Sequence, residues 1–144
     1  TDFSHANLKE SNIEGADLKN AQMKGADLSD TLMTGVFLSH ANLSDANFTN
    51  SELIAADLTD SYLSRANFEN AYMNHADLSG ANLKLAINLT QEQIETTFID
   101  RGTIFPDTLS IVWVSDTEYE FKWVVFHRLI FFNGIIIPAC VSLL

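Results

Sequence analysis

Residues 41–60 read ANLSD ANFTN SELIA ADLTD, four consecutive units of one five-residue pattern. The same five-residue unit continues in frame around central residues that run from Phe3 to Leu83. The central position is apolar in all 17 units, and the position two residues earlier is small in 16 of them. Asp or Asn lies between these two positions in 11 units. Residues 1–85 therefore repeat the unit Ala-(Asp/Asn)-Leu-x-x.

A period of five residues fits neither an α-helix nor a continuous strand. On an α-helix the apolar residues would spiral around every face, and along a strand they would change sides at every unit. The pattern fits a very short strand followed by a corner. The small residue and the Leu then point inward, and the Asp or Asn between them points outward. Gly15, Gly25, Gly35 and Gly80 fall at the last corner position, where glycine tolerates unusual backbone angles.

This run of units resembles the pentapeptide-repeat family. The resemblance covers residues 1–85, and 17 consecutive units in frame make it specific. It implies an all-β solenoid, a right-handed quadrilateral β-helix of about four coils, with four units or about twenty residues per coil. Residues twenty positions apart then form columns, so we expect Phe48 to stack on Phe68 inside the rod.

After the seventeenth unit the frame ends, and the next segment has the signature of a helix start. Thr90 and Gln93 are placed as the N-cap and the third helical residue of a capping box. We expect a helix over roughly residues 91–100, with Ile94 and Phe98 packed together. Such a helix would close the end of the solenoid, where an uncovered coil is a sheet edge that invites aggregation.

The chain divides into three parts on this basis. Residues 1–88 are expected to form the β-helix, residues 89–110 the capping helix and a loop, and residues 111–144 a C-terminal extension. Within the extension, residues 111–123 partly alternate between apolar and polar side chains, which suggests a strand or a hairpin. Residues 124–144 are too apolar to lie in water.

Two interpretations of the apolar tail remain open. A stretch of 21 residues is long enough to cross a membrane, but His127 and Arg128 lie near its start, and Pro138 weakens a helix. The alternative is a segment packed against a partner chain or a second copy. The candidate membrane or docking residues are Trp123, Leu129, Phe131, Phe132, Ile135, Ile136 and Ile137.

Some outward positions break the repeat by carrying a large apolar side chain instead of Asp or Asn. Irregular positions in a regular repeat are where function is expected to show. In the quadrilateral coil, Leu32, Phe37, Ile54 and Tyr72 fall along one edge of the rod, and we take them as a candidate partner-binding strip. The alternative is scattered apolar residues, which are normal on protein surfaces.

Composition limits the classes of function. The formal net charge of −11 disfavours direct nucleic-acid binding, and Cys140 has no second cysteine with which to pair. His5, His40 and His75 are 35 residues apart, so they fall on different sides of the rod and cannot share a metal. No carboxylate pair or Ser-His-Asp arrangement stands out, so we expect no enzyme, no metal and no cofactor. Because the chain starts at Thr1, within a repeat, we expect a processed or trimmed product.

The expected function is a non-catalytic protein–protein interaction or scaffold module, possessing an apolar tail that tethers it to a membrane or docks it in an assembly. The expected partner is a protein or the remainder of a larger complex, and a homo-oligomer is left open. The resemblance implies an alternative, an acidic rod that imitates duplex DNA and protects a type II topoisomerase. Both a membrane-associated and a cytoplasmic location agree with the sequence.

Overall fold

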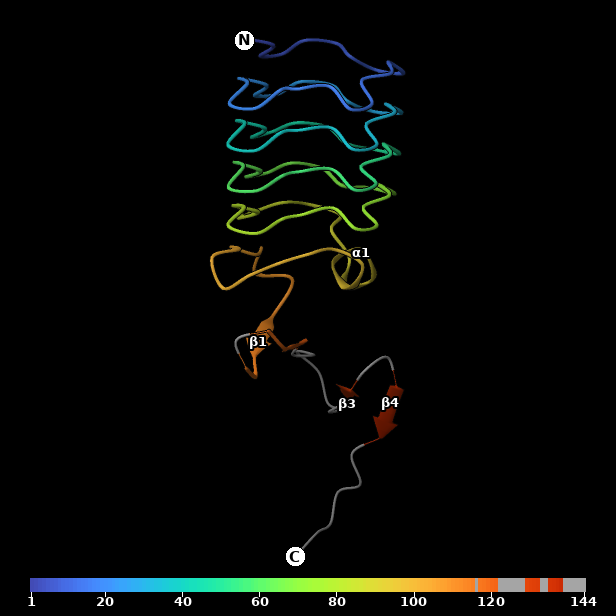
Figure 1. Cartoon of the computed structure of the whole chain (residues 1–144), viewed down its shortest axis with the longest axis vertical. Helices are drawn as coiled ribbons and strands as arrows, with labels where there is room; N and C mark the ends of the chain where they lie inside the picture. Colours follow the sequence, from blue (N-terminus) through green and yellow to red (C-terminus); the bar gives the residue numbers. More distant parts are fainter. Residues whose placement is uncertain (116, 122–128, 133–134, 139–144) are drawn as a thin grey trace, which may run out of the picture.

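The computed structural model describes residues 1–115, 117–121, 129–132 and 135–138. Coils of nearly equal size stack from the N-terminus downward, and the short helix and strands follow them (Figure 1). The elements in chain order are α1 (Gln91–Glu95), β1 (Ile111–Trp113), β2 (Tyr119–Phe121), β3 (Leu129–Phe132) and β4 (Ile135–Pro138).

Main-chain hydrogen bonds join each coil to its two neighbours. In the unit at residues 41–45, the outward Asn42 donates its N–H to the Ala21 carbonyl of the preceding coil at 2.9 Å. The inward Leu43 donates to the Tyr62 carbonyl of the following coil at 2.8 Å. Parallel bridges join residues 20 positions apart from Asp2 to Ile87, which gives the four-sided coil that the resemblance implies, and the last two bridges join residues 21 and 22 positions apart.

The bridges define four faces, which we name by their outward residues. Face A and face B follow each other around a coil, and face C and face D complete it. The outward residues are Asp2, Gln22, Asn42, Tyr62, Asn82 and Ile104 on face A; Asn7, Asp27, Asn47, Asn67 and Ile87 on face B; Asn12, Leu32, Glu52 and Tyr72 on face C; and Asp17, Phe37, Asp57, Asp77 and Phe98 on face D.

The interior is filled by the small and the large inward side chains. From the second coil onward nearly all of them are fully buried, and in the first coil they are partly exposed. Phe48 and Phe68 stack at 5.2 Å between ring centroids with an interplanar angle of 8°, which confirms the predicted pair. Such a contact contributes about 0.5–1.5 kcal/mol beyond the burial of the rings.

The last corner position of every unit has a left-handed backbone. All 17 of these residues have φ between 53° and 69°, although only four of them are glycine. For residues other than glycine, Asn and Asp, this backbone conformation is unfavourable by roughly 1–2 kcal/mol. The sequence suggested this conformation only at the glycines, and the structure extends it to residues such as Ala55 and Leu85.

The regular frame ends with an inserted residue. Ala86 and Leu89 are buried, and Asn88 between them has φ of 56° and is exposed. Thr90 then starts α1 as its N-cap, and the capping box with Gln93 is present as predicted.

The predicted extent of the helix, residues 91–100, is wrong. α1 ends at Glu95, because Phe98 returns to the ladder of face D and donates its N–H to the Ala76 carbonyl at 2.8 Å. Ile94 is fully buried and Phe98 is 59% exposed, so the predicted packing between these two side chains is also wrong.

One side chain of α1 connects the helix to the last regular coil. The Nε2 of Gln93 donates to the carbonyls of Phe68 and Ala71, both at 2.9 Å. These two carbonyls would otherwise lie at the uncovered end of the coil. The contact agrees with a capping role, and that role stays a prediction, as does the division of the chain into three parts.

Two antiparallel hairpins follow the coils. β1 pairs with β2, with Val112 opposite Glu120, so the strands expected within residues 111–123 are present. β3 pairs with β4, with Phe131 opposite Ile136. Trp123 and much of the apolar tail lie outside the described residues. Within the ranges given above, no helix has the length and the apolar character needed to cross a membrane.

An exchange of Gly and Ala within one corner tests the left-handed geometry. Gly35 and Ala55 occupy the same corner in successive coils, and a Cβ added at Gly35 would meet no atom within 4 Å. We therefore expect Gly35→Ala to lower the free energy of unfolding by about 1 kcal/mol through backbone strain alone. Ala55→Gly should raise it, by less than that, because glycine also gains freedom in the unfolded chain. Urea denaturation measures both changes. Changes of the same sign in the two variants would contradict the assigned geometry.

Candidate interaction surfaces

The outward Asp and Asn residues have a structural task at the corners. In each of the 11 units that carry them, the side-chain oxygen accepts a hydrogen bond from the N–H two residues later. Asn42 accepts from Ser44 at 3.2 Å, and Asp77 accepts from Ser79 at 2.9 Å. This local bond satisfies the one corner N–H that the main-chain ladder leaves out, which explains why the repeat favours these two residue types.

Four outward positions give up this bond for an apolar or aromatic group. None of these residues has a short side-chain acceptor beside the corner N–H, and Leu32, Phe37, Tyr62 and Tyr72 are 39%, 42%, 56% and 58% exposed. Each of them forgoes a hydrogen bond of about 0.5–1.5 kcal/mol without burying its own side chain. The residues are therefore unfavourable for the stability of the rod.

The structure places the predicted strip along one edge of the rod, with gaps. Leu32 and Phe37 lie in the same coil on the adjoining faces C and D, and Ile54 is at the corner between these faces in the next coil, half-buried. Tyr72 is two coils from Leu32 on face C, with Glu52 between them. The four residues share an edge without forming a continuous apolar surface.

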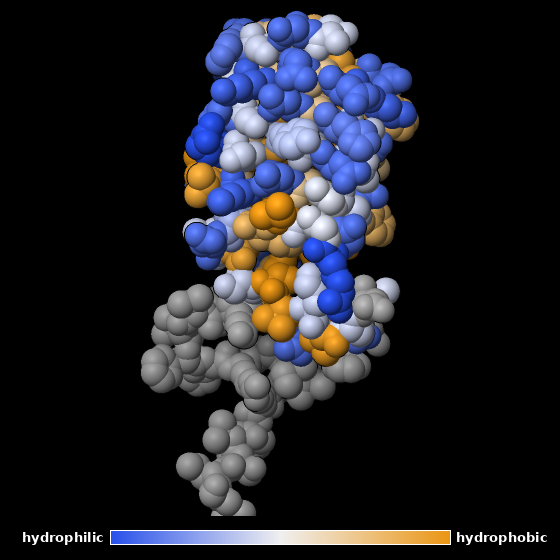
Figure 2. Space-filling view, turned by 90° about the vertical axis from the view of Figure 1, so that its left-hand side faces the viewer, coloured by the Kyte–Doolittle hydropathy of each residue, from blue (hydrophilic) through white to orange (hydrophobic). Residues whose placement is uncertain are grey.

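A second group of exposed apolar residues surrounds the C-terminal end of the coils. Leu85, Ile87, Phe98 and Ile104 are 49–59% exposed and lie on faces A, B and D or at a corner. Apolar side chains gather toward this lower end in Figure 2, and the upper half is mostly polar. The sequence analysis missed this group. The five-residue frame extends to Ile87 and could have revealed it, whereas Phe98 and Ile104 follow the irregular helix.

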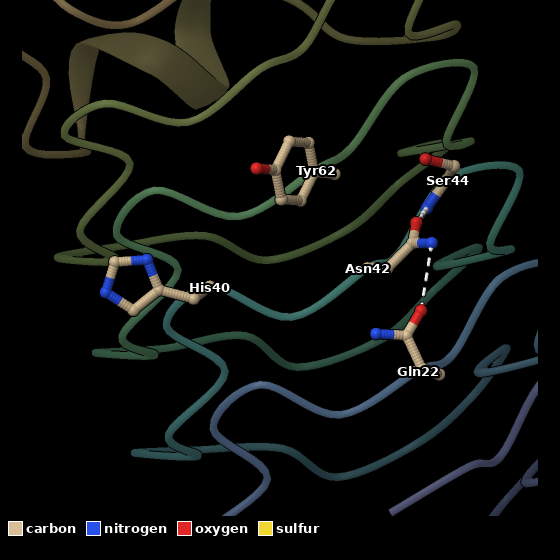
Figure 3. Close-up of a pocket in the computed structure, with 5 residues that line it drawn as sticks. All are labelled: Gln22, His40, Asn42, Ser44 and Tyr62. Atoms are coloured by element: carbon tan, nitrogen blue, oxygen red, sulfur yellow. Dashed lines mark hydrogen bonds between the residues drawn. The ribbon is translucent and has the colours of Figure 1, made fainter.

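Face A has a shallow depression in its middle. Its volume is about 270 Å³, and it is lined by Gln22, His40, Asn42, Ser44 and Tyr62. Figure 3 shows Asn42 between His40 and Ser44, with Tyr62 and Gln22 on the neighbouring coils. Asn42 donates from Nδ2 to Oε1 of Gln22 at 3.2 Å. The lining is polar and open, with no enclosed space for a reacting molecule.

Charged groups on the rod are paired along columns. The Arg65 guanidinium donates to both carboxylate oxygens of Asp45, one coil above, at 2.6 and 2.8 Å. This pairing lowers the pKa of Asp45, and the N–H of Gly80 together with Thr103 and Gly102 lowers the pKa of Asp100. A lowered folded-state pKa adds stability above the unfolded pKa near 4 that is lost as the pH falls through the folded value.

The histidines are dispersed over the rod in the part of the chain that the structure describes. His5, His40 and His75 lie at three different corners, and no three His, Cys, Asp or Glu side chains gather closely enough to hold a metal. Every buried side-chain nitrogen or oxygen there has a hydrogen-bond partner.

Comparisons with known proteins agree with the repeat pattern and the coiled fold. The family model described as pentapeptide repeats matches residues 1–35, 21–60 and 51–87. A comparison with curated protein sequences gives no match. Among solved structures, HetL, a pentapeptide repeat protein involved in heterocyst differentiation regulation in the cyanobacterium Nostoc sp. Strain PCC 7120, is 25% identical with a TM-score of 0.56. The match covers 74% of this chain and 46% of HetL, so the chain spans less than half of that protein.

Two further structures are similar. The pentapeptide repeat protein alr5209, from Nostoc PCC 7120, is 27% identical with a TM-score of 0.50, over 72% of this chain and 84% of that one. A trypsin-treated form of QnrB1, a plasmid-mediated fluoroquinolone resistance protein, is 20% identical with a TM-score of 0.31, over 74% and 61% of the two chains. At that TM-score the likeness to QnrB1 supports no functional inference.

Restoring the missing corner acceptor should stabilise the rod. We expect Tyr72→Asn to raise the free energy of unfolding by about 0.5–1.5 kcal/mol, because the new side chain accepts from the Asn74 N–H. Tyr72→Ala removes the same ring without supplying an acceptor and is the matched control. Urea denaturation of both variants measures the difference, and an Asn variant no more stable than the Ala variant would show that the corner bond contributes nothing.

Proposed function

We propose that this chain, which belongs to the pentapeptide-repeat family, is a non-catalytic protein-interaction or scaffold module. The observation that carries the proposal is the presence of exposed Leu32, Phe37 and Tyr72 on two adjoining faces, at positions where Asp or Asn would stabilise a corner. A rod selected for stability alone has no use for these groups. A rod that binds a protein partner has a use for them, because aromatic and aliphatic anchors contribute much of the energy of an interface.

The interior supports the same proposal. The inward side chains fill the rod, so a substrate has no room inside it. The depression on face A is polar and shallow. The rigid ladder instead holds outward side chains at fixed spacings, which suits a surface that must bind without rearranging.

We place the partner contact at the strip of Leu32, Phe37, Ile54 and Tyr72. Three of these side chains are exposed, and Glu52 between Leu32 and Tyr72 adds a charged group within the same face. Polar groups among apolar anchors are typical of non-obligate interfaces. Lys19 lies over the Phe37 ring at 4.9 Å, so this ring is partly covered and Leu32 and Tyr72 are the better anchors.

The DNA-mimic alternative has the net charge in its favour, −11 over the whole chain. Its acidic groups are dispersed among the four faces and interrupted by Arg65 and Lys9, which pair with Asp45 and Asp30. An imitation of duplex DNA needs a continuous array of negative charge. The exposed apolar groups have no role in that mechanism, so we favour the interaction module.

Partner capture by matched variants tests the proposal. The wild-type chain, a Leu32→Asn/Tyr72→Asn variant and a Tyr62→Asn variant serve as baits, and captured proteins are quantified by mass spectrometry. We expect the double variant to lose its specific partner by at least about tenfold, since two anchors together contribute more than 1.4 kcal/mol. Tyr62 lies on another face, and its variant should keep the partner. Equal capture by all three baits would refute the strip, and a captured type II topoisomerase would favour the alternative.

The apolar segment at residues 124–144 is the second part of the proposal. We propose that it docks into an assembly or tethers the chain to a membrane, through the side chains already named from Trp123 to Ile137. Phase partitioning of the full chain in detergent solution separates the two arrangements. Docking in a protein assembly predicts a monodisperse complex in the aqueous phase, and a tether predicts recovery in the detergent phase. A monodisperse monomer in the aqueous phase would contradict both.

A further inference from the structure

We propose that the free edge of β1 binds an extended segment of a partner protein in which apolar and basic residues alternate, and that this segment adds to the hairpin as a third strand. The inference rests on the proposed interaction function and deepens it by assigning a second surface and the chemistry of its ligand. The surface lies in the extension after the coils, away from the strip on faces C and D.

The hydrogen-bond pattern of the hairpin leaves one side of β1 open. The N–H of Val114 donates to the carbonyl of Glu118 at 2.9 Å, and the register continues with Val112 opposite Glu120. In an antiparallel pair, bonded and non-bonded positions alternate. The main-chain groups of Ile111 and Trp113 therefore point away from β2, and within the described ranges no main-chain partner meets them.

A groove lies against β1. Its volume is about 460 Å³, and both β1 and the preceding loop line it. The loop contributes the half-buried Phe105 and Leu109, which also pack against the core, and Thr103, Asp107 and Ser110 make much of the groove's lining polar. An extended peptide is held by main-chain bonds to such an edge, and its alternate side chains fill the adjoining pockets.

The two edges of the hairpin are protected differently. Natural sheets protect their edges with charged side chains, Pro or bulges. β2 carries Glu120 in its centre, whereas β1 reads Ile-Val-Trp without any of these devices. Val112 is 38% exposed and Val114, just after the strand, is 58% exposed. An apolar, unprotected strand edge beside a groove of mixed polar and apolar lining has the features of a strand-binding site.

The groove also indicates the charge of its ligand. Asp107 is the one charged residue among those that line it. Arg101 lies 5.8 Å from the Trp113 ring and donates to the Ser115 carbonyl, which limits the open edge to the length of β1. We therefore assign the site to a short extended segment with apolar residues alternating with Lys or Arg, one of which faces Asp107.

A peptide experiment on the full chain tests the assignment. The probe is a fluorescently labelled six-residue peptide of alternating valine and lysine, and its binding is followed by polarisation. We expect saturable binding that weakens at least about tenfold when the backbone nitrogens facing β1 are methylated, because methylation removes the donors of the ladder. Asp107→Asn should weaken binding severalfold and reduce its dependence on salt, while Asp57→Asn on face D leaves both unchanged.

The outcomes distinguish this inference from the proposed function. Equal affinity of the methylated and unmethylated peptides, or of the Asp107 and Asp57 variants, would overturn the assignment. If it fails while capture still depends on Leu32 and Tyr72, the proposed function stands and only the β1 site is refuted. If the chain forms an oligomer and the Asp107→Asn substitution dissociates it, a second copy occupies the groove. That result also overturns the assignment.

Discussion

The main-chain ladder between coils sets the geometry of the whole rod. Each unit is too short to form a stable strand by itself, so its N–H and C=O groups must find partners in the coils above and below. That requirement fixes the 20-residue spacing, and the spacing places side chains in columns. The Phe48–Phe68 stack and the Arg65–Asp45 pair both follow from it, because each joins residues 20 positions apart.

The corners impose the second requirement. Each coil must turn four times within 20 residues, and the structure does so with a left-handed residue at the end of every unit. The outward Asp or Asn then satisfies the corner N–H that the ladder does not reach. Because this task is structural, departures from it are informative. The apolar residues on faces C and D are conspicuous since they forgo a bond that their neighbours make.

Much of the coil could be predicted because each unit repeats the same local chemistry. The inward positions, the frame and the capping box around Thr90 were all readable from residue type and spacing. The early end of α1 was not readable, since the capture of Phe98 by the ladder of face D is a contact over 22 residues. The groove beside β1 depends on how a loop folds against a strand, and no periodic pattern records that. The strip residues could be identified, and so could Glu52 between Leu32 and Tyr72, because these three residues lie 20 positions apart in one column.

Residue-resolved hydrogen exchange tests the ladder most directly. In the middle coils four of the five N–H groups of a unit bond to the main chain, and where the outward residue is Asp or Asn, the fifth N–H, after the central residue, bonds to its side chain. The account predicts protection with a period of five residues, and fast exchange at Thr34 and Asn74, where Leu32 and Tyr72 supply no acceptor. Slow exchange at these two amides, or protection without the five-residue period, would contradict it.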